Sequence, residues 1–265
     1  MDSLPPLPSS IIELSDFKKV KNSNPERLIK IIEKDPLMVA TILKTANSSL
    51  FGFRSKVDTL SRAIYLLGMN FTISIAMSTV IQDTLKSNLC AYAVSTQDFL
   101  FASSLATKIV NTWISSIDFD LNNELLIPAF LQEIGKFVIS EIIQENKQTE
   151  EFLKLINEKK DIAFCEEKFT GYSCARITAN ILKNWSLGHN IVFSIGFVGN
   201  IKNCPEEFIK KVQILEIIKI LTDIRAPLND LAIEKAIAKV IEYGFDLEHF
   251  INSIDIIKEE IEKNS

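Results

Sequence analysis

Glycine, proline and long apolar runs are scarce in this sequence. The 265 residues include only 8 Gly and 8 Pro, whereas 47% are hydrophobic and 24% are charged. So few turn-forming residues disfavour a β-rich fold, and the balance of apolar and charged residues is typical of a folded domain. No apolar run approaches the roughly 20 residues that a membrane-spanning helix needs. The sequence therefore predicts a folded protein without a membrane as partner.

Histidine is also scarce, which limits the possible chemistry. The two histidines, His189 and His249, lie far apart, and neither belongs to an H-x-x-x-H or H-D pair. A histidine-rich metal site cannot be built from them, and a Ser or Cys nucleophile would lack a ready general base. The phosphate-binding motifs G-x-x-x-x-G-K-[ST] and G-x-G-x-x-G are absent as well. We expect both histidines to lie at the surface or at a helix end.

An excess of positive charge is missing too. The net charge is −5, and the Lys and Arg residues are scattered among Glu and Asp. A sequence-independent grip on DNA or RNA needs clustered basic residues, so nucleic acid is not expected as a partner. The first ten residues, MDSLPPLPSS, do not resemble a signal peptide, and four widely spaced cysteines are typical of reduced thiols. These features predict a cytoplasmic protein.

What the sequence does contain is a helical period along nearly its whole length. Apolar residues recur at i, i+3, i+4 and i+7 in the ranges 39–46, 106–113, 214–221 and 233–240. No clear period-2 alternation appears. We predict an all-α protein of about a dozen helices, the last three of them after Pro205.

The stretch AFLQEIGKFVIS (129–140) combines apolar and polar residues in a way that needs explanation. Helical spacing places Gln132, Glu133, Lys136 and Ser140 in a narrow polar stripe, with apolar side chains opposite. By pattern alone, this stretch is an amphipathic helix with one face in solvent.

Several stretches together resemble the HDOD domain, a bacterial signalling module related to HD phosphohydrolases and HD-GYP domains. They are LPPLPSSIIEL near the start, IIEKDPLMVATILKTANSSLFG (31–52), VDTLSRAIYLLGMN (57–70), FLQEIGKFVIS and ILKNWSLG. These motifs follow the family's order across residues 4–200. The resemblance implies a two-lobed HDOD domain at 1–200, with an N-terminal helical lobe at 1–90 and an HD-hydrolase-like helical lobe at 91–200. A C-terminal helical extension at 201–265 would follow.

The resemblance also implies where metal ligands would lie in an HD enzyme. The corresponding positions, in chain order, are Ser103 or a neighbour, Gln132-Glu133, Ser173-Cys174 and Val198-Gly199. Every expected histidine is missing. Only Glu133 keeps a carboxylate, although Gly135 and Lys136 keep the residues that follow the family's His-Asp pair. We therefore predict a vestigial site at Ser103, Gln132, Glu133, Lys136, Ser173, Cys174 and Val198, with no catalytic residue, metal or cofactor.

Other residues that match the family have structural explanations. They are Pro36, Asn47, Gly52, Gly68, Gly135 and Trp185. Pro36 suits a helix start, and Asn47 is expected to bond the backbone through its side chain. Gly52 and Gly68 suit helix ends with positive φ, and Trp185 suits packing in the core or between lobes.

These features favour a non-catalytic regulatory protein that binds other signalling proteins. Two alternatives stay open: a residual metal-dependent phosphohydrolase that uses Glu133 and Lys136, and a nucleotide-sensing pocket without turnover. Lys136 has a simpler explanation as an i, i+3 partner of Glu133 on the helix surface. For Glu166 and Glu167, a place near a helix start, where the helix dipole favours negative charge, is a sufficient explanation.

Overall fold

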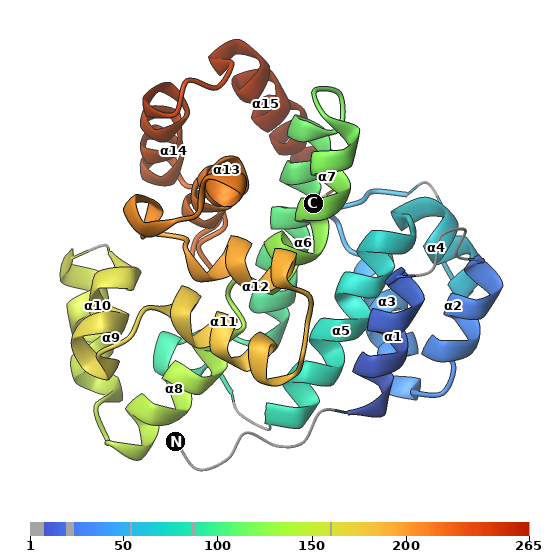
Figure 1. Cartoon of the computed structure of the whole chain (residues 1–265), viewed down its shortest axis with the longest axis horizontal. Helices are drawn as coiled ribbons and strands as arrows, with labels where there is room; N and C mark the ends of the chain where they lie inside the picture. Colours follow the sequence, from blue (N-terminus) through green and yellow to red (C-terminus); the bar gives the residue numbers. More distant parts are fainter. Residues whose placement is uncertain (1–7, 20–23, 54, 86–87, 160, 265) are drawn as a thin grey trace.

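The computed structural model describes residues 8–19, 24–53, 55–85, 88–159 and 161–264. In these ranges the chain forms α-helices α1 to α15 and three short 3-10 helices, and no β-strand. Figure 1 shows α1 to α5 gathered on one side of the molecule, α8 to α12 on the other, and α6 and α7 between them. The predicted all-α fold is confirmed for the described residues.

The N-terminal lobe consists of α1 (Ser9–Lys19), α2 (Pro25–Ile32), α3 (Pro36–Ala46), α4 (Leu60–Leu67) and α5 (Met69–Leu85). The side chains of Asn24 and Asp35 cap α2 and α3, and each is followed by a proline at the first helical position. Gly68, with φ 82°, ends α4.

In the described part of the chain, no single helix could span a membrane. Among the residues searched, one helix pair, Leu60–Leu67 and Met69–Ile81, has the length and composition of a membrane span, but the pair is bent by 116°.

The loop between α3 and α4 is held closed by Asn47. The Asn47 amide nitrogen donates hydrogen bonds to the carbonyl oxygens of Leu43 and Val57, both at 2.7 Å. Its Oδ1 accepts a hydrogen bond from the backbone N–H of Val57 at 2.8 Å. Gly52 lies in this loop in the left-handed region, with φ 53°. One side chain therefore satisfies three backbone groups across the loop.

The second lobe contains the 3-10 helix Cys90–Tyr92, then α6 (Thr96–Ile114), α7 (Phe119–Leu131), α8 (Gly135–Glu145), α9 (Thr149–Lys159), α10 (Ile162–Thr170), α11 (Cys174–Asn184) and α12 (His189–Gly196). α7 is the central element, because it packs against α5, α6, α12 and α13. Every residue from 125 to 137 is buried. The end of α7 and the start of α8 are therefore shielded from bulk solvent.

Contacts between α5 and α7 join the two lobes. The rings of Phe71 and Phe130 meet edge to face at 5.9 Å. Nearby, the Asn70 amide nitrogen donates a hydrogen bond to Asn123 Oδ1 at 3.0 Å. The N-terminal lobe is thus coupled by direct contact to the helix that leads into Gln132 and Glu133.

The chain after residue 200 forms two 3-10 helices (Ile201–Asn203 and Glu206–Phe208) and three long helices, α13 (Ile209–Leu221), α14 (Asp230–Glu242) and α15 (Leu247–Asn264). The three predicted C-terminal helices are confirmed. α13 packs on α6, α7 and α12, and α15 packs on α6. The buried Trp113 ring contacts Phe245 and Phe250 at 5.4 and 4.9 Å. These helices share a core with the second lobe, and a domain boundary at 200 stays a prediction.

Histidine, cysteine and Trp185 occupy ordinary structural positions. His189 is the first residue of α12, and half-buried His249 on α15 places its Nε2 2.9 Å from the Trp113 carbonyl oxygen. All four cysteines are free, as expected; two are buried, whereas Cys90 is exposed. Trp185 is buried at the end of α11.

Candidate functional site

The segment 129–140 is not a single helix with one face exposed to solvent. α7 ends at Leu131, a turn follows, and α8 begins at Gly135. Gln132, Glu133, Lys136 and Ser140 are all buried. The amphipathic-helix interpretation is therefore wrong, because Glu166 of α10 and Lys219 of α13 pair with polar side chains that were expected to face water.

Gly135 allows α11 to pack directly on this turn. A Cβ at Gly135 would lie 2.8 Å from both the Cys174 carbonyl oxygen and Thr178 Oγ1. Without a side chain, the Gly135 N–H donates to Thr178 Oγ1 at 2.9 Å, and the Thr178 hydroxyl donates to the Gln132 carbonyl oxygen at 3.1 Å. Thr178 thus satisfies two backbone groups between the helices, and the turn is held rigidly against α11.

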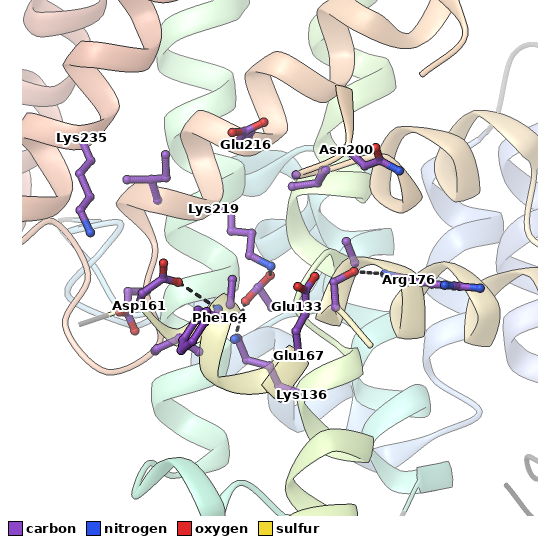
Figure 2. A pocket seen from close by; sticks show the side chains of 18 of the residues that line it. Glu133, Lys136, Asp161, Phe164, Glu167, Arg176, Asn200, Glu216, Lys219 and Lys235 are labelled. Atoms are coloured by element: carbon purple, nitrogen blue, oxygen red, sulfur yellow. Dashed lines mark hydrogen bonds and ion pairs between the residues drawn. The ribbon is translucent and has the colours of Figure 1, made fainter. Parts of the chain in front are cut away.

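Glu133 lies at the centre of a buried group of charged side chains. Its Oε2 is 2.9 Å from Lys136 Nζ, and its Oε1 is 2.8 Å from Lys219 Nζ. Lys136 also pairs with Glu166, whose Oε1 accepts a hydrogen bond from the Tyr92 hydroxyl at 2.9 Å. Figure 2 shows Lys136 and Lys219 approaching Glu133 from two sides. We call Glu133, Lys136, Glu166 and Lys219 the ion cluster.

Opposite charges in the ion cluster outweigh the effect of burial. Burial alone would lower the pKa of Lys136, but Glu133 and Glu166 raise it well above its usual value. The pKa of Lys219 is raised in the same way, mainly by Glu133. Burial would raise the pKa of Glu133, yet Lys136 and Lys219 hold it below its usual value. These three groups are therefore charged near neutral pH.

The other predicted site positions carry neutral side chains. Ser103, Gln132, Cys174 and Val198 are buried, and Ser173 caps the start of α11. Burial, followed by the nearby carboxylates, raises the pKa of Cys174 to about 12. Cys174 is therefore a thiol and not the thiolate that a metal prefers.

One pocket collects four of the predicted site residues. It has a volume of about 970 Å³ and is lined by Glu133, Lys136, Ser173 and Val198, together with residues of α10, α13 and α14. Ser103, Gln132 and Cys174 are buried and do not line it. The structure thus brings four of the seven predicted positions to one pocket, with Glu133, Lys136 and Lys219 of the ion cluster in its wall.

A metal ion of the HD type does not fit these residues. Glu133, the one carboxylate at the family's His-Asp position, has an ammonium group on each of its oxygens. Across the described residues, no group of three or more His, Cys, Asp or Glu side chains converges. A transition metal needs several deprotonated ligands to compete with water, and two fixed positive charges repel a further cation.

Half of the ion cluster was absent from the sequence prediction. The i, i+3 pair of Glu133 and Lys136 is present, but Lys136 is 2% exposed, so its predicted place on the helix surface is wrong. Glu166 is buried inside α10, so the helix-start explanation is also wrong for it. Lys219 was missed. A lone cation within the apolar segment ILEIIKIL of α13 is the signal that could have identified it.

The chain belongs to the HDOD domain family, whose profile matches residues 4–201. The match spans both lobes and ends just before α13. The family assignment therefore covers the turn at Gln132 and Glu133, whereas Lys219 lies beyond it.

Similarity to individual proteins is distant but extends over most of the chain. An uncharacterised protein of Treponema pallidum (strain Nichols) is 23% identical over 218 residues, which are 78% of this chain and 40% of that protein. This chain thus spans less than half the length of that relative.

Two solved structures share the fold. An HDOD domain protein of unknown function from Geobacter sulfurreducens has a TM-score of 0.67 and 18% identity, with 100% of this chain and 94% of that chain covered. A protein from Marinobacter aquaeolei VT8, provisionally described as a signal transduction protein, has a TM-score of 0.70 and 17% identity, with 98% and 59% covered.

Proposed function

We propose that this chain is a non-catalytic HDOD regulatory protein that acts by binding other signalling proteins. The ion cluster carries this proposal. A hydrolytic HD site needs a metal to activate water, and here the remaining carboxylate is neutralised by Lys136 and Lys219. The scaffold of the site is kept, while the charge that would bind a metal is already balanced.

A residual phosphohydrolase is disfavoured by the partners of Lys136. Its ammonium group pairs with both Glu133 and Glu166 and lies 5.0 Å from the centroid of the Tyr92 ring. A phosphate would have to displace a buried carboxylate to reach it, which leaves that carboxylate unpaired. The relationship of the family to HD phosphohydrolases therefore accounts for the presence of the pocket, and we do not infer hydrolytic activity from it.

A regulatory role is supported by the description of a protein with a similar fold. The Marinobacter aquaeolei protein with the same fold is provisionally described as acting in signal transduction. The four free cysteines support the expected cytoplasmic location, where thiols stay reduced. We propose other signalling proteins as the partners.

Two measurements on the full chain test this proposal. Hydrolysis of cyclic dinucleotides and nucleotides is measured with added Mn²⁺, for the native chain and for Glu133→Gln, which keeps the shape of the side chain. We expect both proteins to remain at the buffer background. Activity in the native chain that Glu133→Gln abolishes would establish a phosphohydrolase instead. Affinity capture from the native cells is expected to recover the same signalling proteins in repeated experiments, and repeated failure to recover any would contradict the interaction role.

A further inference from the structure

The outer part of the pocket is chemically distinct from the ion cluster at its wall. The positive charges of Lys136 and Lys219 are already balanced by Glu133 and Glu166. The outer part consists of the other lining residues, which come from α10, α11, α13 and α14. This outer part decides which ligand the pocket can accept.

Carboxylates outnumber cations in this outer part. The lining carboxylates are Asp161, Glu167, Glu216 and Asp223, and the lining cations are Arg176 and Lys235. Lys239 adds one more positive charge, 3.3 Å from Glu216. Four carboxylates still face three cations, and both Arg176 and Lys235 are exposed at the rim. A nucleotide with several phosphates would meet an excess of negative charge.

One face of α10 presents an acid, an aromatic ring and a second acid in sequence. Asp161, Phe164 and Glu167 follow one another at intervals of three, and all three line the pocket. The Phe164 side chain is 50% exposed. Figure 2 shows Asp161, Phe164 and Glu167 around the pocket, together with Lys235 of α14. Such a strip is complementary to an apolar residue flanked by positive charges.

The rim of the pocket also carries exposed apolar side chains, and one of them contacts a guanidinium group. Besides Phe164, the rim residues Tyr172 and Leu231 are 43% and 41% exposed. The Arg176 guanidinium carbon lies 5.4 Å from the Tyr172 ring centroid, a distance suited to a cation–π contact. Exposed apolar side chains that surround a polar pocket are typical of surfaces that bind another protein.

We infer that this pocket binds a segment of a partner protein in which Arg or Lys alternates with large apolar residues. The inference rests on the proposed function and names the partner's chemistry. The basic side chains would pair with Asp161 and Glu167, and with Glu216 of α13 or Asp223 just after it. The apolar side chains would cover Phe164 and Leu231. The ion cluster would stay intact during binding.

A pair of charge-reversal variants tests this inference. The full chain is titrated with the acetylated, amidated peptide Leu-Arg-Phe-Arg-Leu, and binding is followed by calorimetry and by amide NMR shifts. Glu167→Lys changes a lining residue, whereas Glu234→Lys makes the same charge change at an exposed residue of α14 outside the lining. We expect shifts on α10 and α14, roughly tenfold weaker binding for Glu167→Lys, and no more than about a twofold change for Glu234→Lys.

Several results would overturn the inference. An equal loss of affinity in both variants would show that only the net charge attracts the peptide. Stronger binding of Leu-Glu-Phe-Glu-Leu or of ADP would reverse the assigned charge preference, and equal binding of free arginine amide would point to a small cation as ligand. Absence of any binding of the Arg peptide would also contradict it. None of these results changes the expected lack of hydrolysis, so the proposed function is tested separately.

Discussion

Two turns that match the family's motifs differ sharply in how they are stabilised. The loop after α3 is held by the neutral side chain of Asn47, at a partly exposed position. The turn between α7 and α8 is held by the buried charges of Glu133 and Lys136 and by Thr178. The first turn depends on ordinary hydrogen bonds, each of which contributes about 1 kcal/mol. The second turn depends on buried charges that stabilise it only while each charge keeps its partner.

This difference explains why only the second turn suggests a former active site. A buried ion pair gains little net stability over apolar packing, because desolvation opposes the attraction. Loss of one partner is nevertheless strongly destabilising, since the other charge is left unpaired in the interior. We therefore propose that the arrangement at Glu133 descends from a charged metal site and was not selected for stability.

Removal of Glu133 should have the largest effect. Glu133→Ala leaves Lys219 without its carboxylate and Lys136 with only Glu166, so we expect a loss of about 3–5 kcal/mol in the free energy of unfolding. Urea denaturation measures this loss. The control is Glu13→Ala, which breaks the exposed pair with Lys34 and should change stability by about 0–1 kcal/mol. Equal effects of the two variants would contradict the account of the buried cluster.

Removal of Asn47 should have the next largest effect. Asn47→Ala deletes three hydrogen bonds to the backbone of Leu43 and Val57. We expect about 2–3 kcal/mol of destabilisation in urea, because water can reach part of this loop and replace some of the lost bonds. Asn47→Asp keeps the acceptor for the Val57 N–H and should recover part of the loss. A loss as large as that of Glu133→Ala would remove the contrast between the turns.

The two glycines should respond differently to an added methyl group. At Gly135 a Cβ would meet the Cys174 carbonyl oxygen at 2.8 Å, which is backbone and cannot move aside, so Gly135→Ala should cost about 1–3 kcal/mol. At Gly52 the nearest atoms belong to the Asn264 side chain, which can rotate away. Gly52→Ala should cost only about 1 kcal/mol through its positive φ. Thermal denaturation of both variants compares them, and the reverse order would contradict the close packing of α11.

The alkaline pH dependence of stability should depend on Cys174. Its folded pKa of about 12 exceeds the ordinary value of 9.0, so the folded state keeps a proton that the unfolded state releases. Its contribution is present below pH 9.0 and is lost as the pH rises toward 12. Between these values, Cys174 makes the free energy of unfolding fall by up to about 1.4 kcal/mol per pH unit. Cys174→Ala should remove this part of the slope. The exposed Cys90→Ala is the control, and an unchanged slope in Cys174→Ala would contradict the buried thiol.

The sequence predicted what depends on local signals and missed what depends on distant ones. Helical periodicity at 39–46 and the suitability of Pro36 for a helix start identified α3 in the N-terminal lobe. The spacing of Glu133 and Lys136 identified their pairing. Periodicity describes only one helix at a time, so it could not show that neighbouring elements bury residues 125 to 137. Nor could any local pattern bring Lys219, far along the chain, to Glu133.

The metal content of the native protein tests the central claim most directly. We propose that the ammonium groups of Lys136 and Lys219 stand where an HD enzyme places its metal charge. Mass-spectrometric metal analysis of the full chain, purified without chelator, should then find far less than one Mn, Fe or Zn ion per molecule. One tightly bound ion per chain, lost in Glu133→Gln, would contradict the claim.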